Sequence, residues 1–353
     1  METVTDISNR MKRLTTIFNK RILPDIEREQ ERQKVNRVAP GAFMVMVKKE
    51  VSDHIRSWRF IILFSIIILT CLGSVLSALQ GFSDAIKASQ GDESFFFLRL
   101  FTATDGTLPS FFVFVSFLGP LLGISMGFDA INTEENKNTL SRVMSHPIHR
   151  DSIINAKFVS ALAVLSVMFF LLGFIVMGMG IIAIGIPPTP EEFLRVICFI
   201  ILTILYVSFW LNLSIFFSVK FRQPATSALS GIAVWLFLTV FYSILVSVVA
   251  KAAAPSEMAS SQQVMKYQQL VFGMQKILPS EMFSDATTTL LVPTIRTLGP
   301  LTAEKMYGTL PSALPLGQSL LIVWPQITGL VAASILCFVL SYISFMKREI
   351  RSG

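Results

Sequence analysis

The longest apolar stretch of the chain, "FVSALAVLSVMFFLLGFIVMGMGIIAIGI" at residues 158–186, contains no charged residue. About 20 apolar residues in an α-helix are enough to cross the hydrocarbon core of a bilayer. Five further apolar stretches occur, at residues 60–79, 108–128, 193–217, 226–249 and 319–345. None of them shows the polar–apolar alternation of a membrane β-strand. The sequence therefore predicts an all-α integral membrane protein with six transmembrane helices, and not a β-barrel.

The composition leads to the same class of protein. Hydrophobic residues make up 52% of the 353 residues and charged residues only 15%, whereas soluble domains carry about 25% charged residues. Lys and Arg concentrate in four polar segments, which hold 22 of the 30: residues 1–59, 129–157, 218–225 and 346–353. Because Lys and Arg favour the cytoplasmic side of a membrane, we expect both termini in the cytoplasm.

The net charge of +7 is explained by this distribution, and no nucleic-acid partner is needed for it. The basic N-terminal segment could also contact anionic headgroups of the lipid bilayer. The three cysteines all fall within expected spans, so we expect them to be packing residues without disulfides.

The spans divide the chain into five parts. These are a cytoplasmic tail (1–40), an amphipathic interfacial helix (41–59), transmembrane helices 1–5 with a cytoplasmic loop at 129–157 (60–249), an extracytoplasmic helical insertion (250–318), and transmembrane helix 6 with the C-terminus (319–353).

The interfacial helix is predicted from the spacing of its apolar residues. In "GAFMVMVKKEVSDHIRSWRF" (41–60), steps of three and four residues place one set on a single helical face: Phe43, Val47, Val51, Ile55 and Trp58. A helix of this kind lies in the membrane interface. The alternative is a surface helix of a small soluble lobe.

The second expected span contains three glycines spaced by four residues, Gly119, Gly123 and Gly127. Small residues at this spacing let two helix backbones approach closely. We expect them to pack this span against another helix, either within one subunit or in a mobile contact between subunits.

The insertion contains two helical patterns, "SSQQVMKYQQLVFGMQKI" (260–277) and "PSEMFSDATTTLLVP" (279–293). We expect short helices folded over the outer mouth of the transmembrane bundle.

The spans contain almost no ionisable residue, which disfavours proton- or ion-coupled transport. Among their polar residues, Asn212 and Gln326 are interpreted as interhelical hydrogen-bonding residues, with a contact to cargo as the alternative. No set of residues for catalysis is found, so a membrane enzyme is disfavoured, unless Glu281 and Asp285 bind a metal. The chain also lacks a phosphate-binding loop of the G-x-x-x-x-G-K-[ST] type, so energy for uphill transport would come from a partner.

A polar stretch, "FDAINTEENKNTLSRVMSHPIHRDSIINAKF" (128–158), separates the second and third spans. Its pattern predicts a short helix that starts near Asn138 and Thr139, exposes Leu140 and Met144 on one face, and ends before Pro147. A short apolar-faced helix outside the membrane suits a groove on a soluble partner. The alternative is a loop that rests on the lipid headgroups.

This stretch resembles the first cytoplasmic loop of ABC-2 type transporter permeases. The resemblance rests on residues that match the family's pattern: Asp129, Glu134, Thr139, Leu140, Met144, Ser145, Pro147, Arg150 and Lys157. It extends to the six-helix layout, the amphipathic helix and the enlarged loop between the fifth and sixth spans, from about residue 41 onward. Asn138 stands where the family usually has glycine, and asparagine tolerates the same left-handed backbone.

The resemblance implies a permease that pairs with a second, identical or related permease subunit and with two nucleotide-binding subunits. ATP and Mg would bind to those partner subunits, and no cofactor would bind to the chain directly. The short helix would couple the permease to the ATPase, with a second contact on the turn at 218–224. The coupling residues expected are Glu134, Thr139, Leu140, Met144, Pro147, Arg150, Lys220 and Arg222.

Relatives in this family suggest that the cargo is hydrophobic or amphipathic and is exported. Candidate wall residues of a path between subunits, on the second and fifth spans, are Phe111, Phe112 and Phe114, which could equally face lipid. An ATP-driven mechanical or sensory component that signals to an extracytoplasmic partner is the alternative function. The layout favours a prokaryotic cell membrane.

Overall fold

In a computed structural model of the chain, the described residues are 41–88, 95–103, 108–139, 150–185, 187–255, 260–294 and 313–348. The chain divides into two units, Met1–Met46 and Val47–Gly353. Of the first unit only 41–46 are described, and they belong to the start of one helix. The expected tail at 1–40 lies outside the described residues. The bundle and its contacts belong to the second unit.

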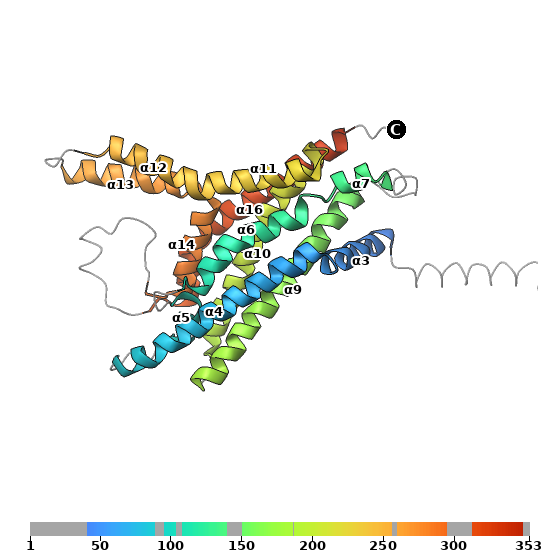
Figure 1. Cartoon of the computed structure of the whole chain (residues 1–353). Helices are drawn as coiled ribbons and strands as arrows, with labels where there is room; N and C mark the ends of the chain where they lie inside the picture. The colour runs from blue at the N-terminus through green and yellow to red at the C-terminus, as the bar shows by residue number, and fades with distance from the viewer. Residues whose placement is uncertain are drawn as a thin grey trace, which may run out of the picture. The chain divides into compact units, whose positions relative to one another are not determined.

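The described residues form helices and their connections, with no strand among them (Figure 1). In chain order the helices are α3 (Ala42–Ile55), α4 (Trp58–Ala88), α5 (Phe96–Thr102), α6 (Phe111–Gly127), α7 (Asn132–Asn136), α9 (Arg150–Ile184), α10 (Pro190–Lys220), α11 (Pro224–Leu236), η2 (Phe237–Phe241), α12 (Tyr242–Ala252), α13 (Ser261–Gln275), α14 (Pro279–Leu291) and α16 (Leu316–Lys347).

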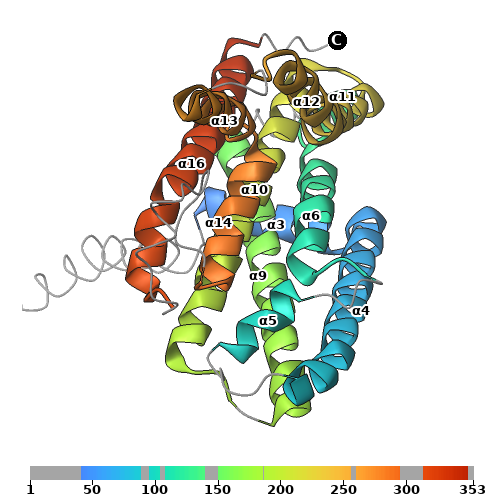
Figure 2. The ribbon, with the colours of Figure 1, turned by 90° about the vertical axis from the view of Figure 1, so that its left-hand side faces the viewer.

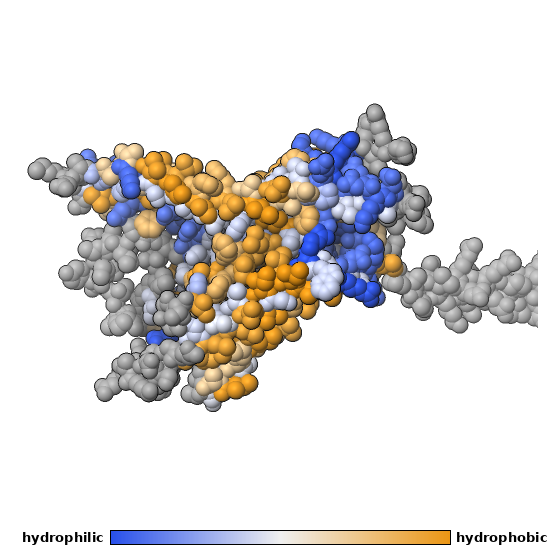
Figure 3. Space-filling view, in the orientation of Figure 1, coloured by the Kyte–Doolittle hydropathy of each residue, from blue (hydrophilic) through white to orange (hydrophobic). Residues whose placement is uncertain are grey.

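Six segments of these helices are long and apolar enough to span a membrane: Trp58–Leu79, Phe111–Asn136, Arg150–Ala183, Pro190–Lys220, Pro224–Ala252 and Leu316–Lys347. Each overlaps one of the six stretches expected from the sequence. The prediction of an all-α protein with six membrane-spanning helices is confirmed. Figure 3 shows the apolar side chains as a broad belt beside a polar end that contains α3 and α7.

Helix α10 is the centre of the bundle. It begins with a capping box, in which Thr189 and Glu192 accept each other's backbone N–H groups around Pro190. Its apolar window is 67% buried, whereas that of the fifth span is only 11% buried. Figure 2 shows α10 and α14 between α16 on one side and α6 on the other. Most of the packing that fixes the bundle is therefore made against α10.

The glycines of α6 pack directly against the backbone of α10. A Cβ atom on Gly123 would lie 2.8 Å from the carbonyl oxygen of Val207, and one on Gly127 would lie 2.9 Å from that of Leu211. A Cβ atom on Gly119 would lie 2.9 Å from the Val207 side chain. Contacts this short leave no room for a side chain, so the three glycines bring α6 and α10 together within one subunit.

Two hydrogen bonds reinforce this contact between α6 and α10. The Ser214 hydroxyl donates to the carbonyl of Ile124 at 2.8 Å, and the Tyr206 hydroxyl donates to the carbonyl of Ser116 at 3.1 Å. Both acceptors are carbonyls of α6, and each receives a side-chain donor from α10. The pairing of these two helices is thus fixed in register as well as in distance.

Helix α14 lies beside α10 and runs antiparallel to it. The ring of Phe283 stacks on that of Tyr206 at 4.5 Å, near the middle of α10, while the carbonyl of Leu290 meets Arg195, near the start of α10. Each helical residue rises 1.5 Å, so Phe283, seven residues before Leu290 on α14, lies about 10 Å farther along the bundle than Leu290. The expectation of helices folded over the mouth does not describe α14, which packs at the depth of the spans.

The position of α14 has a physical reason. Its buried face combines Phe283, Ala286 and Leu290 with the small side chains of Thr287 and Thr289, so it fits closely between α10 and α16. A helix satisfies its own backbone hydrogen bonds and can therefore enter the apolar depth of a bundle. The sequence pattern alone could not distinguish this from packing on a surface.

The fifth span is divided by a π-helical turn, η2, between α11 and α12. Such turns are rare and occur often at functional sites. Helix α13 folds back along α12, where the Tyr242 hydroxyl donates to the carbonyl of Met274 at 3.0 Å. Apolar side chains of η2 and α12 are exposed, among them Phe237, Phe241 and Ile244.

Candidate functional site

The loop after α6 lies at one end of the bundle, together with the ends of α10 and α16 and the start of α9; we call this the α7 end. The backbone N–H groups of Ile131 and Asn132 donate to the buried Ser218 hydroxyl at 2.9 and 3.3 Å. The Asn132 amide donates to the carbonyl of Phe128 at 3.1 Å. The two bonds to Ser218 fasten α7 to the last turn of α10, and the third holds α7 to the end of α6.

The chain leaves α7 through a left-handed residue. Asn138 has a φ of 53°, which agrees with the expectation that it stands in for a glycine. The hydroxyl of the next residue, Thr139, donates to the carbonyl of Glu134 at 3.1 Å. This hydrogen bond closes a tight turn at the end of α7.

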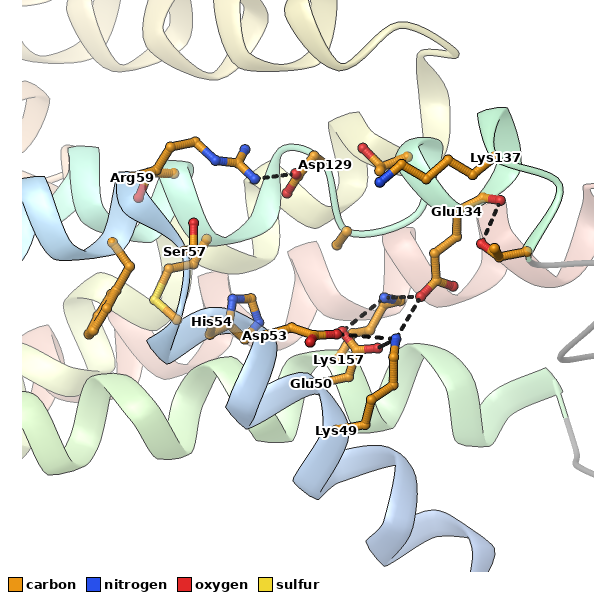
Figure 4. Close-up of a pocket in the computed structure, with 16 residues that line it drawn as sticks. Lys49, Glu50, Asp53, His54, Ser57, Arg59, Asp129, Glu134, Lys137 and Lys157 are labelled. Carbon is orange, nitrogen blue, oxygen red and sulfur yellow. Dashed lines mark hydrogen bonds and ion pairs between the residues drawn. The ribbon is translucent and has the colours of Figure 1, made fainter.

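A buried lysine joins α7 to two other helices. The Lys157 ammonium lies 2.8 Å from a carboxylate oxygen of Glu134 and 3.1 Å from one of Glu50 (Figure 4). Its side chain is only 7% exposed. Lys157 belongs to α9, Glu134 to α7 and Glu50 to α3, so one ammonium connects three elements.

The charges in this cluster are balanced. Burial by itself would raise the pKa of Glu50, but the charge of Lys157 and the hydrogen bond from Lys49 outweigh it and hold that pKa below its usual value. Lys49 lies 2.9 Å from Glu50 and 3.7 Å from Glu134. We call Lys49, Glu50, Glu134 and Lys157 the ion cluster. Both carboxylates contact Lys157 only when α3, α7 and α9 are together.

Two further ion pairs hold the α7 end. Arg59 lies 2.6 Å from Asp129 and packs over the ring of Phe128. Arg348, just after α16, lies 2.7 Å from Glu135 and also donates to the carbonyl of Val219. The loop is thereby tied to the first, fourth and sixth spans.

A cavity of about 530 Å³ opens beside the ion cluster (Figure 4). It is lined by Lys49, Glu50, Asp53, His54, Ser57, Arg59, Phe60, Ser125, Met126, Asp129, Ala130, Thr133, Glu134, Lys137, Thr139 and Lys157. Burial lowers the pKa of His54, although nearby carboxylates partly oppose this. In the described part of the chain, no three acidic, histidine or cysteine side chains are grouped to hold a metal ion.

The structure brings together part of the expected coupling set. Glu134 and Thr139 lie in or beside the ion cluster, and Arg150 begins α9 and donates to the carbonyl of Arg348 at 3.4 Å. Lys220 ends α10, and the carbonyl of Arg222 accepts a hydrogen bond from Asn136 at 2.9 Å. Three members of the expected set lie outside the described residues: Leu140, Met144 and Pro147.

Sequence reasoning placed Lys157 only in the family pattern and assigned no role to Glu50. The signal available was an acid on the amphipathic helix and a lysine at the edge of an apolar span. Neither reveals that the two side chains meet, because Glu50 and Lys157 are 107 residues apart.

The candidate pathway residues differ in their surroundings. Phe111 is buried and packs edge-on against Phe101 and Phe199, at 5.2 and 6.1 Å between ring centres. Phe112 and Phe114 are only partly buried.

The two polar residues expected within the spans are also buried. The Asn212 amide donates to the carbonyl of Ser334 at 3.4 Å, a contact between α10 and α16. Gln326 is 6% exposed, and its carbonyl oxygen has no hydrogen-bond partner within the described residues.

At the opposite end of the bundle, Arg195 is fully buried. Its guanidinium lies 2.9 Å from the Glu191 carboxylate and donates to the carbonyls of Leu290 and Leu314 and to the Ser319 hydroxyl. It therefore ties the start of α10 to the end of α14 and the start of α16. Arg195 falls near the start of the apolar stretch at residues 193–217, and the sequence alone does not reveal these contacts.

Helix α14 also carries the two acids considered for a metal site. Glu281 and Asp285 are partly exposed and lie one turn apart, at the depth where Phe283 meets Tyr206. The spans themselves carry few charges. These two carboxylates lie at the level of the spans because they belong to α14, which is part of the insertion.

Comparison with known proteins agrees with this architecture. The model of a family described as "ABC-2 family transporter protein" matches residues 44–350. A search of curated proteins gave no match. Because the match covers the six spans, the loop at the α7 end and helix α14, the chain belongs to the ABC-2 transporter family, as a multi-pass membrane component of an ABC transporter.

Proposed function

We propose that the chain is the permease subunit of an ABC exporter that moves a hydrophobic or amphipathic cargo, driven by ATP hydrolysis on a separate subunit. Membership of the ABC-2 family supports the transport role. The scarcity of charged residues in the spans supports an uncharged or amphipathic cargo. The chain itself is proposed to have no catalytic activity and to bind no cofactor directly.

The observation that carries this proposal is the position of Lys157. Its ammonium bridges Glu134 of the loop and Glu50 of α3, and the lysine is part of α9. Separating a buried ion pair is costly, since it leaves charges without partners. A force applied to the loop is therefore passed to α3 and the third span as one body. That is what a coupling element between an ATPase and a membrane path requires.

The docking surface for the ATPase is proposed on either side of this cluster. Leu140 and Met144 would fill apolar pockets on the partner, next to Thr139 and Pro147, with Arg150 at the rim. Lys220 and Arg222, between α10 and α11, would form the second, smaller contact. The hydrogen bond from Asn136 to the carbonyl of Arg222 brings the two segments together at the α7 end, which supports a common partner.

The proposed assembly contains two nucleotide-binding subunits, which hold ATP and Mg, and a second permease subunit, identical or related. The α7 end and both termini would lie in the cytoplasm, as the distribution of Lys and Arg favours. The proposed location is a prokaryotic cell membrane.

The test is ATPase activity of the complex, purified in lipid with its nucleotide-binding subunit. We expect Leu140→Asp combined with Met144→Asp to abolish co-purification of that subunit. Glu134→Gln should retain the subunit but lose the stimulation of ATPase activity by the permease. Lys48→Ala, an exposed neighbour of Lys49 on α3, is the matched control. Native behaviour of the double variant would contradict the coupling role.

The alternative function, a mechanical or sensory component, has one observation in its favour. Helix α13 packs on α12 and exposes apolar side chains, among them Met265, Leu270 and Phe272, which could contact a partner on the extracytoplasmic side. A cargo-free complex whose ATPase activity responds to such a partner, and not to amphipathic compounds, would favour this function over export.

A further inference from the structure

We propose that the cavity beside the ion cluster binds the headgroup of a zwitterionic phospholipid with a primary ammonium, of the phosphatidylethanolamine type. This site does not depend on export or on ATP, because it is a property of the permease subunit in its membrane. It goes beyond the proposed function.

The cavity has the size and the depth of a lipid headgroup site. Its volume of about 530 Å³ falls within the usual range of ligand pockets. Its walls come from α3, the start of α4, the end of α6, α7 and α9. Figure 3 shows that the apolar belt meets the polar end at this level. Lipid headgroups occupy the corresponding layer of a bilayer.

The apolar part of the lining favours the same kind of ligand. Phe60, Met126 and Ala130 line the cavity together with the charged groups. From Phe60 the apolar surface continues along α4, where Ile61 and Ile62 are exposed. A lipid could therefore place its headgroup in the cavity and its acyl chains along α4, which a soluble ligand could not use.

The charges of the lining balance one another. Four cations face four anions: Lys49, Arg59, Lys137 and Lys157 against Glu50, Asp53, Asp129 and Glu134. A lining with no net charge favours neither an anion nor a cation of full charge. It does favour a ligand that carries both charges a short distance apart.

Several donors in the lining are available for a phosphate. Lys137 is exposed and forms no ion pair with another residue in the described part of the chain. The side chains of His54, Ser57 and Thr133 likewise donate no hydrogen bond to another described residue. Charged and hydroxyl donors of this kind are the usual ligands of phosphate oxygens.

An acceptor for the ammonium is available as well. Asp53 is 61% exposed, and its only ion pair among the described residues is with Lys49 at 3.4 Å, on the same helix. A primary ammonium donates up to three hydrogen bonds to such carboxylates, whereas the trimethylammonium of phosphatidylcholine donates none. The site should therefore distinguish the two lipids.

The test is native mass spectrometry of the full-length permease, titrated with phosphatidylethanolamine or phosphatidylcholine of the same acyl chains. We expect about tenfold tighter retention of phosphatidylethanolamine, since a hydrogen bond to a charged group contributes about that factor. Asp53→Asn should remove this preference. Lys137→Ala should weaken the binding of both lipids to the same extent. Thermal unfolding of each variant, measured in parallel, shows that it is folded.

Lys347→Ala is the matched control, because this exposed lysine lies at the same end but outside the lining. Equal retention of the two lipids by the native protein would overturn the proposal. A loss of lipid binding in Lys347→Ala as large as that in Lys137→Ala would overturn it as well.

Soluble glycerophosphoethanolamine, added as a competitor, tests whether the site binds the whole lipid or only a free headgroup. Competition at concentrations equal to the lipid would show that the site reads a free phosphodiester and would refute the lipid assignment. This experiment contains no nucleotide-binding subunit, so a negative result for lipid binding does not bear on the coupling proposal.

Discussion

The ammonium of Lys157 lies 2.8 Å from the carboxylate of Glu134, although the two residues belong to different helices and the lysine is almost completely buried. The pair closes the loop between the second and third spans onto the third span. A buried charge that loses its partner destabilises the folded state far more than an exposed one does. Separating the loop from the third span would therefore destabilise the folded protein.

The first prediction concerns this pair. Glu134→Gln and Lys157→Met should each lower the free energy of unfolding by about 3 kcal/mol, because each removes one charge from the buried ion cluster and leaves its remaining charges unbalanced. The double variant should lose less than the sum of the two single variants, since removing both charges restores the charge balance of the ion cluster. Thermal unfolding in lipid nanodiscs measures the coupling. Lys49→Met, at a mostly exposed lysine, should cost under about 1 kcal/mol. Strict additivity would show that the pair has no mutual interaction.

A second prediction concerns the contact of α6 with α10. Gly123→Ala should destabilise the protein by about 1–3 kcal/mol, because its methyl group meets the Val207 carbonyl and two backbone or Cβ atoms of α10. Gly178→Ala is the control, since no atom lies within 4 Å of its added Cβ. The measurement is again thermal unfolding. Equal effects at the two positions would mean that α6 and α10 are not in close contact.

A third prediction concerns Arg195. Arg195→Met removes the donor to the carbonyls of Leu290 and Leu314, so the end of α14 should open. We expect a loss of about 3 kcal/mol in stability. Hydrogen exchange in Pro279–Leu291 should become faster, while exchange in α6 stays slow. Lys251→Met, at an exposed lysine, should change neither. Unchanged exchange in α14 would contradict the role of Arg195 in holding that helix.

A fourth prediction tests the depth of α14. Phe283→Ala should lower stability by about 3–5 kcal/mol, the usual cost for a buried phenylalanine, because its ring stacks on Tyr206 inside the bundle. Phe272→Ala on α13, where the ring is exposed, should have little effect. If α14 lay on the surface of the bundle, the two substitutions would be similar in a thermal unfolding assay.

The fifth prediction is a pH dependence at His54. Burial lowers its pKa below the ordinary value of 6.5; the charge of Lys157 adds to this, and Glu50, Asp129 and Asp53 oppose it. The unfolded chain then binds a proton at higher pH than the folded one, so stability is full above 6.5 and falls as the pH drops below it. Melting temperatures recorded across this window should fall less for His54→Gln than for the native protein. A native curve that stays flat would rule out the effect.

Much of the candidate site was within reach of the sequence. Glu134, Thr139 and Arg150 were expected in the loop from the family pattern, and the left-handed Asn138 was expected from its place in that pattern. The proposal that Leu140 contacts a partner is still a prediction. Glu50 could not be found, because the pairing of an acid on α3 with Lys157 depends on how three helices pack.

The sequence by itself determined the class of protein and its six spans, because the length and hydropathy of a stretch decide whether a helix is stable in a bilayer. It also contained the glycine ladder, whose spacing requires a close helix partner. Only the tertiary structure decided which partner this is, and that Phe283 lies at the depth of the spans beside Tyr206. The reason is physical: local spacing sets which face of a helix is apolar or small, whereas the neighbour that covers this face depends on contacts between residues far apart in the chain.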